Sequence, residues 1–261
     1  MLGAIVGDVI GSVHEGAGTK TKEFDLFVPG SRFTDDTVLS VAVAEWILDG
    51  GDLVELLHSY TREFPGRGYG GMFYTWVRSN AREPYGSFGN GAAMRVSPVG
   101  FAFDALEDVL ARAKRSAAVT HNHPEGIRGA QATAAAIYYA RLGQTKEQIR
   151  PTLEERFGYD LHARLDDIRP AYGFDETCQG TVPPAVVAFL ESTDFEDAIR
   201  NAVSLGGDAD TLACITGGIA EAYYGGVPEE LANPVRALLD KRLLSVVDRF
   251  RERFHIGARD E

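Results

Sequence analysis

The stretch SLGGDADT, residues 204–211, runs directly into the apolar segment LACITGGIAEAYY, residues 212–224. The small and apolar residues of the second segment predict a central buried helix. The Gly-Gly pair before it permits a tight turn. Asp208, Asp210 and Thr211 stand where this helix begins. Two carboxylates and a hydroxyl at the head of a buried helix indicate a functional site.

A second cluster with the same chemistry lies upstream, where Thr34, Asp35 and Asp36 open another helical segment. Each cluster alone is equally consistent with helix capping, because Asp and Thr accept hydrogen bonds from free amides. Paired carboxylates, however, repel one another unless a cation neutralises them. Carboxylates and hydroxyls without His or Cys match Mg²⁺ or Mn²⁺, and four carboxylates suit two ions. If the fold brings both clusters together, a two-ion site is expected.

Apolar residues recur at helical spacing along most of the chain, and no segment alternates with period two. Glycines 3, 7 and 11 fall on one helical face and permit close approach by a neighbouring helix. Residues 158–180 show no period and are expected to be irregular, either as a functional loop or with short helices that the pattern does not reveal. The fold class is therefore all-α, a compact orthogonal multi-helix bundle in a single domain of residues 1–261. The expected helices cover residues 3–12, 36–48, 53–64, 72–78, 104–119, 127–142, 146–157, 183–190, 195–203, 212–224, 233–242 and 243–254.

The charge balance is 26 basic against 38 acidic residues, a net charge of −12, with the basic residues scattered singly. This argues against a nucleic-acid partner, whose phosphates need clustered cations. Two cysteines are too few for a disulfide framework. No stretch approaches the roughly 20 apolar residues of a membrane helix, and residues 1–10 make a poor signal peptide because Asp8 interrupts them. A cytoplasmic protein without a membrane partner is expected.

Residues 85–95, YGSFGNGAAMR, are rich in small residues that lead into a helical segment. Backbone N–H groups in such a loop are expected to be unpaired and open to an anion, although a plain turn has the same composition. The pattern is no dinucleotide fingerprint, because no strand precedes it. His121 and His123 lack a third metal ligand, so His121 is expected to bond to a ligand or to the backbone.

Five motifs together resemble the ADP-ribosylglycohydrolase family and follow its order over nearly the whole chain. They are GDxxGxxxE at residues 7–15, FTDDT at 33–37, GNGAAMR at 89–95, TH at 120–121 and GGDADT at 206–211. The segments RGYG at 67–70 and GSFGNG at 86–91 resemble the branch that acts on serine-linked ADP-ribose, although this chain is shorter than that branch.

The resemblance implies a compact all-α enzyme that hydrolyses the bond between ADP-ribose and an acceptor, with two Mg²⁺ ions as cofactors (Mn²⁺ as the alternative). It implies an acceptor that is arginine, serine, an acetyl group or a modified nucleic-acid end. The implied metal ligands are Thr34, Asp35, Asp36, Asp208, Asp210 and Thr211. Glu15 is implied beside the ions as a further ligand, a gate or an acid/base group, and either Glu15 or Asp36 is the candidate that moves the proton. The implied substrate-binding residues are Gly86, Ser87, Phe88, Gly89, Asn90, Gly91 and His121.

The sequence alone leaves four points open. Phe88 either stacks on the adenine or ribose or belongs to the core. A non-catalytic ADP-ribose-binding or crystallin-like structural protein is the alternative to an enzyme, although it has no need for adjacent charges. A dinuclear phosphodiester hydrolase is a third reading, and the oligomeric state is undetermined.

Overall fold

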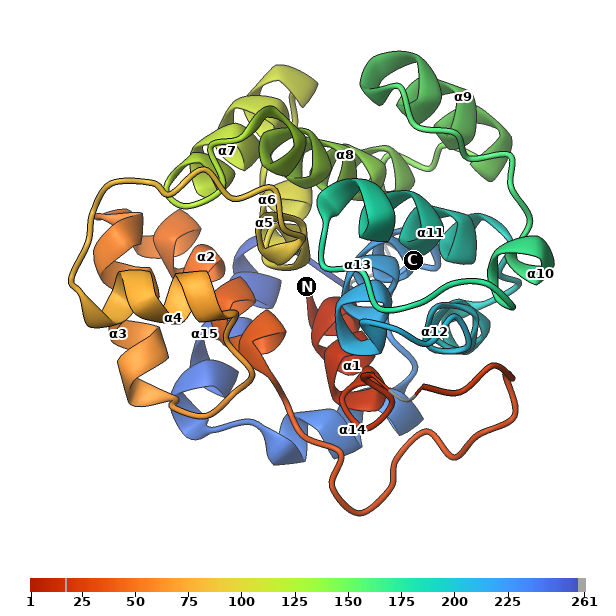
Figure 1. The fold of residues 1–261 in the computed structure, drawn as a ribbon, viewed down its shortest axis with the longest axis horizontal. Helices are drawn as coiled ribbons and strands as arrows, with labels where there is room; N and C mark the ends of the chain where they lie inside the picture. Colours follow the sequence, from red (N-terminus) through yellow and green to blue (C-terminus); the bar gives the residue numbers. More distant parts are fainter. Residues whose placement is uncertain (17, 258–261) are drawn as a thin grey trace.

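The computed structural model describes residues 1–16 and 18–257, which Figure 1 shows as a set of packed helices. Within these residues there are fifteen helices and no strand, apart from two isolated β-bridges. The helices are α1 Leu2–Gly11, α2 Asp35–Asp49, α3 Leu53–Glu63, α4 Gly71–Arg78, α5 Gly91–Met94, α6 Ser97–Ala102, α7 Leu106–Ala118, α8 Pro124–Arg141, α9 Lys146–Phe157, α10 Leu165–Ile168, α11 Cys178–Leu190, α12 Phe195–Val203, α13 Ala209–Tyr223, α14 Glu229–Leu238 and α15 Lys241–Arg253. The predicted all-α class is confirmed.

Helices α1 and α13 lie side by side at the centre of the molecule (Figure 1). They run antiparallel, since Gly3 faces Gly217 while Gly11 faces Asp210. A methyl group on Gly3, Gly7 or Gly11 would overlap backbone atoms of α13. The glycines at spacing four therefore allow the close approach that the sequence predicted, and they bring the end of α1 to the start of α13.

We expect Gly7→Ala to lower the free energy of unfolding by about 3 kcal/mol, because its methyl group would overlap the Ala213 carbonyl. Gly71→Ala is the matched control, since Gly71 begins α4 and a methyl group there meets nothing within 4 Å. Urea denaturation followed by circular dichroism measures both. Equal stability of the two variants would contradict the tight contact.

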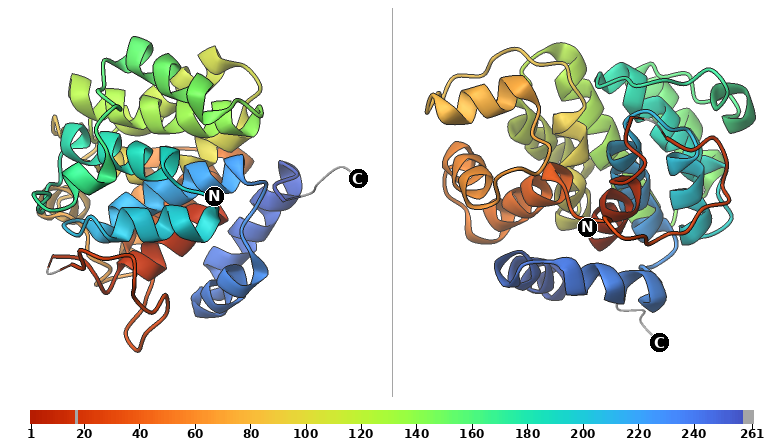
Figure 2. Two further views of the ribbon diagram at one scale, coloured as in Figure 1. Left: turned by 90° about the vertical axis from the view of Figure 1, so that its right-hand side faces the viewer. Right: turned by 60° about the horizontal axis from the view of Figure 1, so that its bottom comes forward.

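The other helices surround this central pair. α8, α11 and α12 pack against α13, whereas α2 contacts α1 and in turn supports α3 and α15. Figure 2 shows α14 and α15 as a layer on one side of the molecule, with α14 against α1. No helix of the described chain combines the length and the apolar character that crossing a bilayer requires. Both cysteines are buried and free.

The start of α11 differs from the prediction. The helix begins at Cys178 and contains Pro183 and Pro184, which were expected to open it. A proline at 184 cannot donate to the Gly180 carbonyl four residues earlier. The hydroxyl of Tyr172 donates to that carbonyl instead, at 2.9 Å. The Tyr172 hydroxyl, which lies outside the helix, thus replaces the missing helical hydrogen bond. The prolines therefore do not mark the start of α11.

Three other predictions of helix bounds were incomplete. The region expected to be irregular contains the short helix α10, and the unpredicted α6 follows α5. α14 begins at Glu229 rather than at residue 233 and includes Pro234. Asp240 then caps α15, because its side chain accepts from the Arg242 amide at 2.8 Å. Helices as short as α6 and α10 show no clear period in the sequence.

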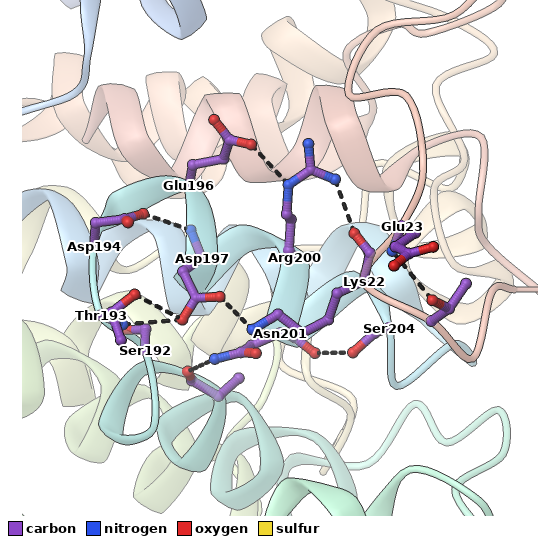
Figure 3. A network of polar contacts seen from close by, with 12 residues as sticks. Lys22, Glu23, Ser192, Thr193, Asp194, Glu196, Asp197, Arg200, Asn201 and Ser204 are labelled. Carbon is purple, nitrogen blue, oxygen red and sulfur yellow. Dashed lines mark hydrogen bonds and ion pairs between the residues drawn. The ribbon is translucent and has the colours of Figure 1, made fainter.

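A network of polar contacts fixes the long connection between α1 and α2 to α12 (Figure 3). Asp194 caps α12 by accepting from the Asp197 amide at 2.8 Å. Asp197 pairs with Lys22. Arg200 donates to the carbonyls of Lys22 and Phe24 at 2.9 and 2.8 Å. The connection that contains Glu15 is therefore held against α12 at residues 22–24.

Candidate functional site

A cavity of about 530 Å³ opens at the starts of α2 and α13. Every predicted site residue except Gly86 lines it. The two acidic clusters, 174 residues apart in sequence at positions 34 and 208, thus meet in space. They meet because the glycine contact sets the end of α1 against α13, while Asp8 in α1 holds the start of α2. The condition on which the expected two-ion site depends is therefore met.

Two groups of carboxylates lie at the base of this cavity. Oxygens of Asp8, Asp36 and Asp210 lie within 4.8 Å of one another, and so do oxygens of Glu15, Asp208 and Asp210. Asp210 belongs to both groups. Burial, followed by the charges of Asp36 and Asp208, raises the pKa of Asp210 well above its ordinary value. Carboxylate oxygens are the donors that a hard divalent cation prefers.

Asp36 is almost completely buried at this point. Its Oδ2 accepts only long bonds, at 3.4 Å, from the hydroxyls of Thr34 and Thr211. Its Oδ1 is buried and has no hydrogen-bond partner among the described residues. Burial, and then the charges of Asp8 and Asp35, raise the pKa of Asp36 well above its ordinary value. The ionised Asp36 carboxylate is therefore energetically costly at this position, and a bound cation would reduce that cost.

Asp8 was not predicted as a site residue, and its side chain anchors α2 to α1. It accepts from the amides of Thr34 and Thr37 at 2.9 and 3.2 Å and from the Thr34 hydroxyl at 2.6 Å. Both of its oxygens are thus engaged, although burial still raises its pKa to about 6. We assign Asp8 to positioning rather than to cation binding. A single carboxylate inside the apolar run of α1 was the signal that points to it.

Asp208 is oriented by two neighbours. Its Oδ2 accepts from the side-chain amide of Asn90 at 2.7 Å. The turn before it has left-handed backbone at Gly206 and Gly207, with φ of 69° and 68°. A side chain at 207 would also overlap the Gly173 carbonyl region at 2.5 Å. The predicted role of these glycines in the tight turn is confirmed.

Glu15 reaches the site from the connection after α1. The Gly16 amide donates to the Gly207 carbonyl at 2.9 Å, which ties this segment to the turn before Asp208. Glu15 itself is exposed. Partial burial, and then the charge of Asp208, raise its pKa above the ordinary value. Its place at the open side of the carboxylates suits a group that exchanges protons with solvent.

Asp35 lies to the side of both groups. It lines the cavity, and its amide donates to the Arg67 carbonyl at 2.8 Å, but its carboxylate belongs to neither set of close oxygens. Burial, followed by the charge of Asp8, raises its pKa well above the ordinary value. Its position near Gly68 places it toward the glycine loop before α4.

The segment of residues 86–91 is less open than expected. The amides of Gly86, Ser87, Gly89 and Asn90 already donate within the protein, to Asn122, Thr120, Ser87 and Glu176. The expectation of freely available N–H groups is therefore wrong for these four. The reason is tertiary for three of them, because Thr120, Asn122 and Glu176 supply the acceptors, whereas the Gly89 amide donates to the nearby Ser87 hydroxyl. Within the described chain, the Phe88 amide has no such partner.

Two aromatic side chains stand at the mouth of the cavity. Phe88 is 47% exposed and Phe174 is 52% exposed, so the alternative of a core role for Phe88 is wrong. Their segments are joined, because the Cys178 amide donates to the Phe88 carbonyl at 3.0 Å. Phe174 was not predicted, since it lies in the stretch without a period. His121 is buried beneath, with Nδ1 2.7 Å from the Thr120 hydroxyl.

Comparison with known proteins identifies the family. The chain matches the family model of ADP-ribosylglycohydrolase over residues 1–258. It is 31% identical over 301 residues to ADP-ribosylhydrolase ARH3 of Xenopus tropicalis, with 86% of each chain covered. It is 27% identical over 275 residues to ADP-ribosylarginine hydrolase Tri1 of Pseudomonas putida, which covers 90% of this chain and 72% of the relative.

A solved structure described as an ADP-ribosylglycohydrolase-related protein complex has the same fold, with a TM-score of 0.71 and 26% identity. The alignment covers 98% of this chain and 97% of that one. The chain therefore belongs to the ADP-ribosylglycohydrolase family, whose members are enzymes that act on ADP-ribosylated substrates.

Proposed function

We propose that this chain hydrolyses the glycosidic bond between ADP-ribose and an acceptor, with two Mg²⁺ ions as cofactors and Mn²⁺ as a suitable substitute. The observation that carries this proposal is the buried, unpartnered Oδ1 of Asp36 among the carboxylates of α2 and α13. A buried carboxylate oxygen without a partner destabilises the protein, and a cation relieves both that cost and the repulsion between neighbours.

The donor set fits the proposed ions. It consists of oxygens alone, from Thr34, Asp35, Asp36, Asp208, Asp210 and Thr211, which suits Mg²⁺ or Mn²⁺ and not zinc. Asp210 would contribute to both ions, since it belongs to both carboxylate groups. When bound, the ions would supply Lewis-acid activation of water and hold the ribose hydroxyls.

Glu15 is the residue that we assign to proton transfer. Breaking the bond at the anomeric carbon builds positive charge on the ribose, and a carboxylate must take a proton from water or give one to the leaving group. Glu15 is exposed beside the cavity, whereas Asp36 is buried at its base. The raised pKa also makes the ionised Glu15 carboxylate a stronger base than an ordinary carboxylate, which suits a group that takes up and releases a proton.

The remaining part of the cavity suits the nucleotide. The whole cavity, at about 530 Å³, falls in the size range of small-molecule sites. The exposed Phe88 ring would stack on the adenine, with Phe174 beside it. The Phe88 amide and the His121 ring would donate hydrogen bonds to the diphosphate, which compensates in part for the acidic surroundings.

A panel of defined substrates tests the proposal. Arginine-linked, serine-linked and O-acetyl ADP-ribose are incubated with the protein and Mg²⁺, and products are separated by chromatography. We expect free ADP-ribose and an unmodified acceptor from at least one linkage. Release of AMP would instead indicate a phosphodiester hydrolase. Binding of ADP-ribose by calorimetry without turnover of any substrate would support the non-catalytic alternative.

A further inference from the structure

A line of hydrogen bonds joins Arg95 to His121 through the Thr120 hydroxyl. Arg95 is completely buried after α5, and its Nη2 donates to Thr120 Oγ1 at 2.8 Å and to the Ser116 carbonyl at 3.0 Å. Thr120 Oγ1 lies 2.7 Å from His121 Nδ1. The three side chains therefore form a continuous path from the interior to the edge of the cavity.

The direction of the second bond follows from the hydrogens available. A guanidinium only donates, so Thr120 Oγ1 accepts from Arg95. The Thr120 hydroxyl then has one hydrogen, and His121 Nδ1 lies 2.7 Å away in hydrogen-bond geometry, whereas the Tyr85 side chain is the other polar group beside it. Donation by Nδ1 would turn that buried hydrogen away from the acceptor at 2.7 Å and would cost this hydrogen bond. His121 Nδ1 is therefore the acceptor.

The imidazole ring is neutral in this environment. Burial, and then the charge of Arg95, hold the pKa of His121 well below its usual range. A neutral imidazole has one hydrogen, so a ring with an accepting Nδ1 has that hydrogen on Nε2.

His121 Nε2 faces the loop that lines the cavity. A methyl group built at Gly91 would lie 3.1 Å from Nε2, and one at Gly89 would lie 3.7 Å away. Most amides of this loop already donate within the protein. An Nε2–H group at this place therefore supplies a hydrogen-bond donor where the backbone offers few.

We propose that Arg95 and Thr120 are positioning residues that hold His121 as the Nε2–H tautomer, so that Nε2 donates to the diphosphate of the bound nucleotide. The choice of ligand rests on the proposed function, whereas the tautomer is a property of the free protein.

The state of Arg95 supports this role. Its Nε and Nη1 atoms have no hydrogen-bond partner among residues 1–16 and 18–257, and it borders the cavity. A buried cation without a paired carboxylate is costly to the fold. An anion held at the cavity by His121 would lie near this charge and be attracted by it.

The tautomer is measured directly in the free protein. Long-range ¹H–¹⁵N correlation spectra distinguish the protonated from the unprotonated nitrogen of each of the six histidines, and His121→Gln assigns the signal. We expect His121 to show a protonated Nε2 and an unprotonated Nδ1. Thr120→Val removes the hydroxyl at nearly constant volume, and Thr120→Ser retains it. Thermal melts check that both variants fold.

We expect Thr120→Val to give a mixture of tautomers and about tenfold weaker binding of ADP-ribose by calorimetry. Thr120→Ser should restore both towards the wild-type values. A protonated Nδ1 in the wild-type protein, or an unchanged tautomer in folded Thr120→Val, would overturn the proposal. If the tautomer is as expected but ADP-ribose does not bind the wild-type protein, the proposed function fails and the hydrogen-bond assignment stands.

Discussion

Asp210→Asn is expected to lower kcat/KM for release of ADP-ribose by roughly a thousandfold, because Asp210 belongs to both carboxylate groups of the site. The substitution preserves size and removes one charge, so the cavity keeps its shape. Initial rates on the linkage that the substrate panel identifies, with excess Mg²⁺, measure the effect. Among residues 1–16 and 18–257, Asp210 is the residue that the two groups share.

The same substitution should stabilise the protein when divalent ions are absent. The pKa of Asp210 is raised above its ordinary value of 3.8, so the folded state binds a proton more tightly than the unfolded state does. Stability therefore falls as pH rises from about 4 through the folded-state pKa. At pH 7 the ionised Asp210 destabilises the fold, and its neutral replacement removes that cost. We expect a higher melting temperature for Asp210→Asn in metal-free buffer.

Asp248→Asn is the control for loss of a surface carboxylate, since Asp248 pairs with Arg236 at 2.6 Å on the exterior. It should retain wild-type activity. Asp210→Asn with undiminished activity would show that Asp210 is not a metal ligand. A lower melting temperature for this variant without ions would instead favour a capping role for Asp210.

Removal of divalent ions is expected to abolish turnover, with at least about a hundredfold loss that Mg²⁺ or Mn²⁺ restores. The protein is treated with a chelator, the chelator is removed by dialysis, and each ion is added back separately. Because a bound ion stabilises only the folded state, Mg²⁺ should also raise the melting temperature of the wild-type protein. It should raise that of Asp210→Asn far less.

Two results would contradict the assignment of the ions. Full activity after chelation and dialysis would show that the reaction needs no divalent ion. Restoration by Zn²⁺ alone would not fit a donor set made entirely of oxygens. Calorimetry with ADP-ribose before and after chelation separates a role in binding from a role in turnover.

Local signals explain which helices the sequence predicts well. The predicted and observed bounds of α9 agree, because Thr145 and Gln148 form a capping box at its start and Gly158 ends it in the left-handed conformation at φ 67°. The predicted start of α11 was wrong because the Tyr172 side chain, from outside the helix, donates to the carbonyl that a proline leaves without a helical partner. Short helices such as α10 have too few residues to show a period.

The candidate site likewise contains residues that a local pattern reveals and residues whose roles depend on the fold. The acidic clusters were visible because each concentrates its residues within a few positions, and their meeting followed from one close helix contact. Asp8 gave a local signal, a carboxylate inside an apolar run, but its role depends on partners in α2. The place of Phe174 depends on the contact between its segment and Phe88, and no local pattern announces it. The identity of the cation, the single-domain assignment and the cytoplasmic location stay predictions.

The glycine contact between α1 and α13 has a consequence for how this protein can change. It fixes the distance between the two acidic clusters through backbone contact, which tolerates no added side chain at Gly3, Gly7 or Gly11. The segments at the cavity mouth, residues 67–73 and 174–177, lie outside that contact. On the proposed function, we expect exchange of those segments between relatives to alter which acceptor is admitted while the spacing of the carboxylates is kept. Acceptor choice and bond cleavage would then be separable traits, carried by different parts of one chain.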